Sequence, residues 1–362
     1  MTFKYKKIFL AAGGTGGHFF SAIALGEELA QRGHVVHLIT DARCQKYFTT
    51  DIKLITHIVD LKPNITSLLK TIKSVFEILL ATLKSLSIIC KNNPSIVIGF
   101  GGYPSFPTML AALLCHTPLV IHEQNCFMGK TNILFARFAR IIALAYRETK
   151  NVGNYQSKII ISGDIIRAGI RNIPIKDNFD HIPFRILVIG GSQGAKFFST
   201  LVPESIEILM RNHPTISLHI VQQVQTEDYD SVNASYAKLG ISYQLSSFFH
   251  NIAELYSCSE LVIARAGALT IAELTAVGIP AILIPLPNAS ENHQFYNAQA
   301  IHNKEAGWCF EQRLVTAPQL ADKILELINN RSILASASRN LLCRKSDGHK
   351  ILADTVEKII TS

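Results

Sequence analysis

The sequence has few charged residues and no long uninterrupted apolar stretch. Charged side chains make up 17% of its 362 residues, below the share of about a quarter that is usual for soluble domains. No apolar run reaches the roughly 18 residues that a membrane span needs. Residues 76–89 come closest and are interrupted by Glu77 and Lys84. The apolar run at residues 8–12 is shorter than the roughly 7 residues of a signal-peptide core. We therefore expect a cytoplasmic protein that touches a membrane at its surface.

Paired cysteines and nucleic-acid motifs are also lacking. The seven cysteines are odd in number and none forms a C-x-x-C spacing, which indicates reduced cytosolic thiols rather than disulfides or a metal site. The net charge of +8 suits nucleic acid, anionic lipid or phosphorylated substrates. Because no recognition helix, zinc-finger spacing or RNA-binding aromatic pattern accompanies it, we expect an anionic membrane surface and phosphates as partners, and no nucleic acid.

A glycine-rich stretch at residues 13–18, with the sequence GGTGGH, organises the N-terminal half of the chain. It follows an apolar run typical of a strand and precedes apolar residues at helical spacing. Glycines at such a turn let the backbone approach a ligand closely, and a helix N-terminus favours negative groups. The same pattern also makes an ordinary tight turn. A second strand, glycine turn and helix start at residues 185–195 favours the ligand-binding interpretation.

The length exceeds the size at which a single core usually stops growing, so we expect two domains. In both halves strand-like and helix-like segments alternate, which predicts an α/β fold with parallel sheets covered on both faces. Ligands bind such sheets at the carboxyl ends of the strands. The loops 13–18, 99–105 and 122–125 all follow expected strands, so we expect them to lie together at that edge of the sheet. The expected strands are residues 34–40, 52–58, 95–100, 118–122, 141–144, 185–189, 216–221, 241–245, 260–264 and 280–285. We expect the chain to leave the first sheet at residues 158–164 and to end in amphipathic helices at 317–360.

A long helical pattern at residues 64–91 carries more apolar residues than one packing stripe needs. Lysines surround it, and acidic residues are almost absent. Two interpretations stay open. Either the helix lies partly in a membrane interface, which its composition suits, or it is buried and its lysines extend to the solvent.

The densest signal of the second half lies at residues 264–273. A strand ends at Ala264, Gly267 permits close approach, and a helix that begins near Ala268 points its N-terminus at the ligand, which favours phosphate. Glu273 is then placed to accept hydrogen bonds from a ribose diol, or it is an ordinary first-turn acid that complements the helix dipole.

Two further segments are candidates for contact with a nucleotide sugar. Residues 248–251 precede a short helix and offer exposed backbone that can read a base edge. Gln294 and Asn297 share one helical face by their i, i+3 spacing, and amide pairs of this kind suit the hydroxyls of a sugar. Ordinary polarity at a helix start is the alternative for both residues.

Several motifs occur in an order that resembles one enzyme family. They are GGTGGH at 13–18, GGY at 101–103, HEQN at 122–125, GGSQGA at 190–195, RAGA at 265–268 with Glu273, and HQ at 293–294. Any one of them is unspecific, but the ordered set closely resembles the MurG family of peptidoglycan UDP-N-acetylglucosamine:lipid I N-acetylglucosaminyltransferases.

The resemblance implies a GT-B fold, in which two Rossmann-like parallel-sheet domains face each other across a cleft. Residues 1–163 would form the acceptor and membrane-associating domain, residues 164–340 the UDP-sugar-binding domain, and residues 341–362 a C-terminal helix that packs back on the first domain. The implied reaction is the inverting transfer of N-acetylglucosamine from UDP-N-acetylglucosamine to the C4 hydroxyl of undecaprenyl-diphospho-N-acetylmuramoyl-pentapeptide (lipid I), which forms lipid II. The resemblance also implies a peripheral place on the cytoplasmic face of the bacterial inner membrane and partners among the proteins of cell-wall synthesis.

The resemblance also implies site residues. On the donor side, the Phe249 backbone would meet uracil, Glu273 the ribose and Gln294 the sugar hydroxyls. The diphosphate would be held by Ser192, Ala268, Leu269 and Thr270, and Arg167 matches a donor-site arginine. The acceptor side of the cleft would be lined by Thr15, Gly16, Gly17 and Asn125.

Direct displacement needs a base for the acceptor hydroxyl. His18 is the first candidate, because a histidine titrates near pH 6.5 and a helix N-terminus favours its neutral form. A positioning role for His18 is the equal alternative, and Glu123 is the second candidate base. Asp228-Tyr229-Asp230 matches the DxD metal motif of another glycosyltransferase class, but we interpret this polar helical stretch, away from any strand end, as a solvated face. We predict no catalytic metal and no cofactor.

Competing interpretations are another GT-B enzyme that uses a UDP-sugar, a nucleotide-sugar epimerase, and a non-catalytic nucleotide-binding protein. An epimerase gives no reason for the apolar and basic helix at 64–91. Neither glycine loop is a strict G-x-G-x-x-G, which argues against a dinucleotide-binding protein, although Asp41 after the second expected strand keeps that interpretation open.

Overall fold

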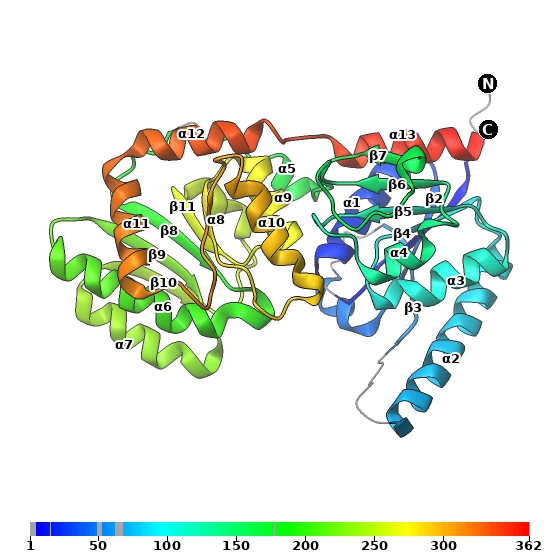
Figure 1. The fold of residues 1–362 in the computed structure, drawn as a ribbon, viewed down its shortest axis with the longest axis horizontal. Helices are drawn as coiled ribbons and strands as arrows, with labels where there is room; N and C mark the ends of the chain where they lie inside the picture. Colours follow the sequence, from blue (N-terminus) through cyan, green and yellow to red (C-terminus); the bar gives the residue numbers. More distant parts are fainter. Residues whose placement is uncertain (1–4, 15, 49–52, 62–67, 177, 362) are drawn as a thin grey trace. The chain divides into compact units, whose positions relative to one another are not determined.

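The chain folds into two compact units, each built on one parallel sheet (Figure 1). The computed structural model describes residues 5–14, 16–48, 53–61, 68–176 and 178–361, and their side chains except at 46, 68–73 and 191–195. Unit 1 comprises Met1–Ala168 and Ser346–Ser362, and unit 2 comprises Gly169–Lys345. The two parallel sheets confirm the predicted α/β class.

Unit 1 holds a seven-stranded sheet with the order β3-β2-β1-β4-β5-β6-β7. Its strands are β1 (Lys7–Ala11), β2 (Val35–Thr40), β3 (Ile55–Ile58), β4 (Ile96–Gly99), β5 (Leu119–Glu123), β6 (Ile141–Leu144) and β7 (Ile159–Ile161). Its helices are α1 (Gly16–Gln31), α2 (Leu68–Asn92), α3 (Phe106–Leu114), α4 (Lys130–Ala136) and α13 (Gly348–Thr361). The central strands are apolar on both faces because helices cover both sides of a parallel sheet.

Strand β1 shows how helices cover both faces of this sheet. Leu10 packs into a core shared with α1 and α13, including Leu25 and Val356. Phe9, the preceding residue, points to the opposite face and packs with Met109 of α3 and Phe135 of α4. Successive side chains of a strand alternate between faces, so the run IFL at residues 8–10 serves two separate cores.

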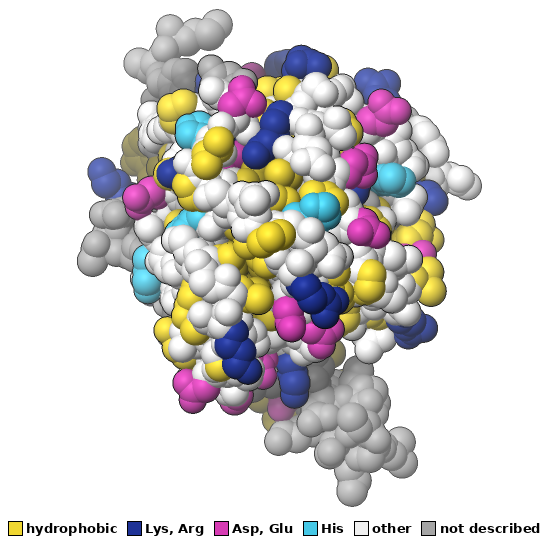
Figure 2. Space-filling view, turned by 90° about the vertical axis from the view of Figure 1, so that its left-hand side faces the viewer, with side chains coloured by type: hydrophobic (Ala, Val, Ile, Leu, Met, Phe, Trp, Pro, Cys, Tyr) yellow, Lys and Arg dark blue, Asp and Glu magenta, His cyan; other side chains and the backbone are white. Residues whose placement is uncertain are grey.

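Unit 2 holds a six-stranded sheet with the order β10-β9-β8-β11-β12-β13. Its strands are β8 (Phe184–Ile189), β9 (Leu218–Gln223), β10 (Ser242–Ser246), β11 (Leu261–Ala264), β12 (Ala281–Leu283) and β13 (Trp308–Cys309). Helix α5 (Ala168–Arg171) lies at the boundary, followed by α6 (Gly191–Asn212), α7 (Tyr229–Leu239), α8 (Ile252–Cys258), α9 (Ala268–Val277), α10 (His293–His302), α11 (Ala317–Asn329) and α12 (Arg331–Leu342). Lys and Arg side chains are interspersed with Asp and Glu side chains on the side of unit 2 that carries α7 and α11 (Figure 2).

Several helix ends follow local chemistry. Helices α7 and α9 end at Gly240 and Gly278, both in the left-handed conformation that a C-terminal glycine adopts without a steric penalty. Helix α11 starts with a capping box, in which the side chains of Thr316 and Gln319 each bond the other residue's backbone N–H.

Each expected strand has an observed counterpart, with both ends correct for residues 141–144 and at least one end shifted in the others, but two strands were not predicted. The first of these lies within residues 158–164, where β7 pairs in parallel with β6 and forms the edge of the first sheet before the chain leaves it. The short edge strand β13 was not predicted. The first unit also runs to Ala168, since Ile165 packs into the core beside α1 and its carbonyl accepts a hydrogen bond from Ser21 at 3.4 Å.

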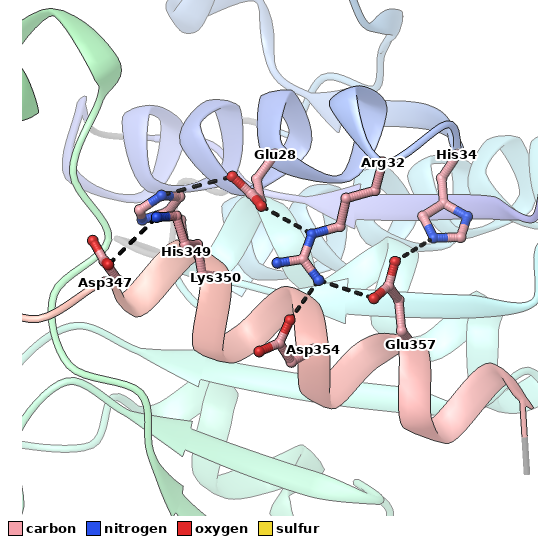
Figure 3. A network of polar contacts seen from close by, with 8 residues as sticks. All are labelled: Glu28, Arg32, His34, Asp347, His349, Lys350, Asp354 and Glu357. Carbon is pink, nitrogen blue, oxygen red and sulfur yellow. Dashed lines mark hydrogen bonds and ion pairs between the residues drawn. The ribbon is translucent and has the colours of Figure 1, made fainter.

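The C-terminal helix α13 lies along α1 and is joined to it by a charged network (Figure 3). Arg32, directly after the end of α1, bonds Glu28 of that helix at 2.9 Å, and also Asp354 at 2.5 Å and Glu357 at 2.9 Å. His34 approaches the other oxygen of Glu357 at 3.1 Å. The last residues of the chain therefore complete unit 1.

Candidate active site

Three loops lie together at the carboxyl ends of β1, β4 and β5, as the sheet rule predicts. A Cβ built on Gly13 would lie 2.9 Å from the Cβ of Pro104. A Cβ built on Gly102 would lie 3.4 Å from Cε1 of His18. His18 in turn acts electrostatically on His122, at the end of β5. Both Gly14 and Gly102 have a positive φ, a backbone conformation that favours glycine at both positions.

Asp41 holds the first glycine loop through hydrogen bonds to its side-chain carboxylate. Its Oδ2 accepts the Gly14 backbone N–H at 2.7 Å, and its Oδ1 accepts the Arg43 backbone N–H at 2.9 Å. The Arg43 guanidinium adds an ion pair at 2.8 Å and lies over the ring of Tyr103. The buried carboxylate is thus occupied by its own loop, which argues against the interpretation that it holds an adenosine ribose.

Glu123 is buried and holds the loop that follows β5. Its Oε1 accepts both the backbone N–H and the side-chain amide of Asn125 at 3.0 Å. Its Oε2 accepts the Gly129 N–H at 3.0 Å and the Asn132 amide at 2.8 Å. Burial raises the pKa of Glu123, and these four hydrogen bonds oppose the increase. With both oxygens occupied, Glu123 is better arranged to position Asn125 than to accept a substrate proton.

His18 lies half-buried in the first turn of α1, after Gly16 and Gly17, which open the helix. The neighbouring His122 is fully buried. Burial lowers the pKa of His122 to about 3, and the proximity of His18 contributes to the decrease. His122, the neighbour of His18, is therefore uncharged at neutral pH. Thr15, the remaining predicted residue of this loop, lies outside the described residues.

Arg167 lies within unit 1, although the sequence placed it in a second domain beginning at residue 164. Its guanidinium is 4.7 Å from the centre of the Phe20 ring, in α1. This cation–π contact brings Arg167 close to the helix that carries His18. The motif around Arg167 does not predict this position, because the position depends on the path by which residues 164–168 return to α1.

In unit 2, the turn between β11 and α9 matches the predicted strand–glycine–helix pattern. Gly267 is extended and precedes α9, whose first turn contains Ala268, Leu269 and Thr270. The Ile271 N–H donates to the Gly267 carbonyl at 3.0 Å and so closes this turn. The first N–H groups of α9 lie at the carboxyl end of the sheet, where they can bind phosphate oxygens.

Glu273 is buried one turn further along α9. The hydroxyl of Tyr256 in α8 donates to its Oε2 at 3.1 Å. The first turn of α9 contains no acidic residue, so the alternative of a first-turn acid that complements the dipole is wrong. The Tyr256 contact fixes the orientation of the carboxylate, and no sequence pattern had indicated this partner.

The two amides of α10 have different surroundings. Gln294 is half-buried, and its side-chain oxygen accepts the Leu286 N–H at 3.0 Å. Asn297 is fully buried and donates to the Ala266 carbonyl at 3.1 Å. Asn297 therefore joins α10 to the turn before α9, and the predicted pair of sugar-binding amides is reduced to Gln294.

The remaining donor-side predictions fall at element ends. Phe249 is buried in the loop between β10 and α8, beside the exposed Phe248. Ser192 lies in the first turn of α6, and its side chain is outside those described. Sequence reasoning gave no role to Arg265, whose buried guanidinium lies over Phe198 and donates to the Ile284 carbonyl at 3.0 Å. Arg265 thus braces the end of β12 against α6.

The DxD sequence does occupy a helical stretch, since Asp228 precedes Tyr229 and Asp230 in the first turn of α7. It also lies away from the strand end, as expected, because β9 ends at Gln223 and the 3-10 turn Thr226–Asp228 separates it from α7. In the part of the chain that the structure describes, no group of three or more His, Cys, Asp and Glu residues is arranged to hold a metal ion.

Two parallel α/β units with glycine turns at the carboxyl ends of their strands define a GT-B glycosyltransferase fold. Residues 8–144 match the glycosyltransferase family 28 N-terminal domain, and residues 185–355 match the C-terminal domain of the same family. The chain therefore belongs to glycosyltransferase family 28.

Relatives match over the full length. The chain is 48% identical to the "UDP-N-acetylglucosamine–N-acetylmuramyl-(pentapeptide) pyrophosphoryl-undecaprenol N-acetylglucosamine transferase" of Rickettsia felis, over 98% of this chain and 100% of the relative. The protein of the same name from Rickettsia canadensis is also 48% identical, with the same coverage. A crystal structure of Acinetobacter baumannii MurG matches with a TM-score of 0.78 and 28% identity, over 98% of this chain and 99% of that one.

Proposed function

We propose that this chain transfers N-acetylglucosamine from UDP-N-acetylglucosamine to the C4 hydroxyl of undecaprenyl-diphospho-N-acetylmuramoyl-pentapeptide. The product is lipid II, the precursor used in peptidoglycan synthesis. The observation that carries the proposal is the full-length identity of 48% to transferases whose names state this donor and this acceptor. The glycine turns of both units supply the local chemistry that such substrates need.

Unit 2 binds the donor in this proposal. The N-termini of α6 and α9 present N–H groups to the diphosphate, together with Ser192 and Thr270. Glu273, held in one orientation by Tyr256, accepts the ribose hydroxyls. The Phe249 backbone reads the uracil edge. Gln294, with its oxygen fixed by the Leu286 N–H, turns its amide toward the sugar hydroxyls.

Unit 1 binds the acceptor along Gly16, Gly17 and Asn125 in this proposal, and Thr15, which lies outside the described residues, is assigned to the same substrate. His18 takes the proton from the acceptor hydroxyl while that oxygen attacks the anomeric carbon. The bond from this carbon to the phosphate oxygen breaks, and UDP leaves with the electron pair. Attack on the face opposite the leaving group inverts the configuration. The imidazole of His18 can accept this proton only in its neutral form. The neighbouring His122 is buried and stays uncharged at neutral pH.

The charge that develops on the leaving UDP is stabilised by fixed dipoles and by Arg167. Helix N-termini already point where the charge appears, so no reorganisation is needed during the reaction. We therefore predict that the reaction needs no metal ion and that activity survives treatment with EDTA. Loss of activity in EDTA that is restored by a divalent ion would contradict this part of the proposal.

The chain also binds peripherally to the cytoplasmic face of the bacterial inner membrane in this proposal. No described helix combines the length and apolar content that crossing a membrane requires. Helix α2 instead extends beyond the other elements of unit 1 (Figure 1), and five of its apolar side chains are 49–62% exposed. They are Val75, Phe76, Leu79, Leu80 and Leu83. A helix that exposes such a face suits an interface between lipid and water, where the lipid-linked acceptor resides.

The decisive experiment measures transfer of radiolabelled N-acetylglucosamine from UDP to a lipid I analogue. We expect a lipid-linked product, and UDP but not NAD should raise the melting temperature of the protein by selective binding. UDP binding without transfer would reject the proposed reaction. Release of N-acetylmannosamine or free sugar instead would favour an epimerase, a class whose fold is shared at a TM-score of 0.70 and 14% identity.

Variants separate the two substrate sides. Glu273→Ala should weaken donor binding, because it removes the proposed ribose contact. His18→Ala should mainly lower kcat, since the candidate base acts in the chemical step. If His18→Ala raised KM and left kcat unchanged, His18 would contribute to binding alone.

A further inference from the structure

Two cysteines of unit 1 are in contact outside the site described above. The Sγ atoms of Cys90 and Cys115 are 3.5 Å apart. Cys90 lies in the last turn of α2 and is exposed, whereas Cys115 ends α3 and is half-buried. Neither residue belongs to the motifs that carry the glycosyl transfer.

The two helices that carry these thiols are packed firmly against one another. Ile89 of α2 and Ala112 of α3, close to the two cysteines in sequence, share one buried core. One to two turns away, the hydroxyls of Ser85 and Thr108 are 3.3 Å apart in the buried contact. A disulfide has sulfurs about 2.05 Å apart, so the thiols must approach by about 1.5 Å from their present separation of 3.5 Å. Both lie at helix ends, where small backbone adjustments cost least.

We propose that Cys90 and Cys115 form a reactive dithiol that a small-molecule disulfide converts reversibly to an intramolecular disulfide. The exposed Cys90 reacts first. Its thiolate attacks one sulfur of the oxidant, which releases one small thiol and leaves a mixed disulfide on Cys90. The Cys115 thiolate then attacks the Cys90 sulfur and releases the second small thiol. The protein loses two protons and two electrons, and both reappear in the two released thiols.

This order of attack agrees with the surroundings of the two sulfurs. Burial raises the pKa of the Cys115 thiol, and the neighbouring Cys90 raises it further. Cys115 is therefore the slower nucleophile toward a reagent in solution, and it resolves the mixed disulfide because Cys90 is already beside it. In a reducing compartment the pair stays a dithiol, and disulfides found there are mainly transient or redox-sensing.

The consequence of the bond is local. It links the end of α2, whose apolar side chains are exposed, to α3 of the same unit. Oxidation should therefore restrain the C-terminal end of α2 without touching the glycine loops. Exchange of backbone amides is the direct measure of such a restraint.

The test uses the full-length reduced protein and oxidised glutathione. After alkylation of the remaining thiols and cleavage by trypsin, we expect residues 85–91 to be linked to residues 92–130, with the loss of two hydrogens. The second peptide also contains Cys126, so Cys115→Ser must abolish the link, as must Cys90→Ser. Cys258→Ser is the matched control, since Cys258 is exposed and lies in unit 2, and this variant must keep the link.

Two outcomes overturn the proposal. The first is glutathione on Cys258 while residues 85–91 and 92–130 stay unlinked, because the oxidant was then active and the pair did not respond. The second is a complete link with unchanged amide exchange at the end of α2, which removes the inferred restraint. Reduction with dithiothreitol should restore both alkylatable thiols, and failure to do so contradicts reversibility.

Discussion

The hydroxyl of Tyr256 donates a hydrogen bond to Oε2 of Glu273 at 3.1 Å, and both side chains are buried. The two residues come from adjacent helices, α8 and α9, of unit 2. This bond fixes the orientation of the carboxylate that we propose for the ribose. A carboxylate held in place loses less conformational entropy when a ligand binds.

Tyr256→Phe should therefore weaken binding of UDP-N-acetylglucosamine. Because the bond already exists without ligand, only its orienting effect on the carboxylate is lost. Immobilising one side chain on binding costs about 0.5–1.5 kcal/mol, so we expect a rise in Kd of about twofold to tenfold and a smaller change in kcat. Titration calorimetry with UDP measures this directly. Tyr229→Phe is the matched control, because Tyr229 is exposed on α7. Equal affinities for wild type and Tyr256→Phe would show that the bond does not serve the donor site.

The pH dependence of stability should report the buried His122. Its pKa is about 3 in the folded protein and about 6.5 in an unfolded chain. The unfolded state therefore binds the proton more tightly, so this contribution to stability is complete above about pH 6.5 and is lost as the pH falls toward about 3. Between pH 6.5 and 5 the loss amounts to about 2 kcal/mol.

Urea unfolding at pH 7.5 and pH 5 measures that loss. His122→Asn should flatten the pH dependence whatever its effect on stability at pH 7.5. His213→Gln serves as the control, because His213 is exposed at the end of α6. A pH dependence of the same slope in His122→Asn and wild type would assign the effect to other groups.

Loss of a buried ion pair in unit 2 should lower the free energy of unfolding far more than loss of an exposed pair. Lys176 Nζ lies 3.0 Å from Oε1 of Glu260, and both side chains are buried. The Arg185 N–H donates to the other oxygen at 2.8 Å. Lys176→Met leaves the carboxylate without its buried cation, and we expect a loss of about 3–5 kcal/mol in the free energy of unfolding.

The control for that prediction is Lys350→Met. Lys350 lies 3.5 Å from Asp347 in a pair whose two side chains are both exposed, at the start of α13, where a pair contributes about 0–1 kcal/mol. Chemical denaturation of both variants gives the comparison. Similar losses in the two variants would mean that the His181 ring, 3.1 Å from the same carboxylate oxygen, replaces Lys176.

The exposed face of α2 should control membrane binding. Replacing Phe76 and Leu80 by Glu places two negative charges among exposed apolar side chains, which opposes both apolar insertion and attraction to anionic lipid. We expect sedimentation with vesicles of phosphatidylglycerol and phosphatidylethanolamine to be lost. Leu314→Glu is the control, because Leu314 is also exposed but lies in unit 2. Unchanged sedimentation of the double variant would locate the membrane contact elsewhere.

The features predicted best from the sequence are those fixed by local chemistry. The turns at residues 13–18 and 264–268 combine a buried strand, glycines and a helix start, and each signal lies within about ten residues of the others. The strand β7 was missed because three isoleucines before Ser162 and Gly163 resemble the exit from a sheet. Only the pairing with β6 makes them a strand.

The features that escaped prediction depend on distant partners. Asn297 looks like a sugar-binding amide until its bond to the Ala266 carbonyl is seen. Arg167 belongs with α1 because residues after β7 return to that helix. Glu123 looks like a base until its four hydrogen bonds with its own loop are counted. Sequence spacing carries no information about contacts of this kind.

The packing of α13 on α1 has a consequence for the order of synthesis. Unit 2 is one continuous segment, whereas unit 1 needs residues from both ends of the chain. On the ribosome, the partners of Arg32 on α13 are made only after the whole of unit 2. Domains usually mature in the order in which they are translated. Here unit 2 can finish folding first, whereas unit 1 cannot bury its whole core until α13 has been synthesised.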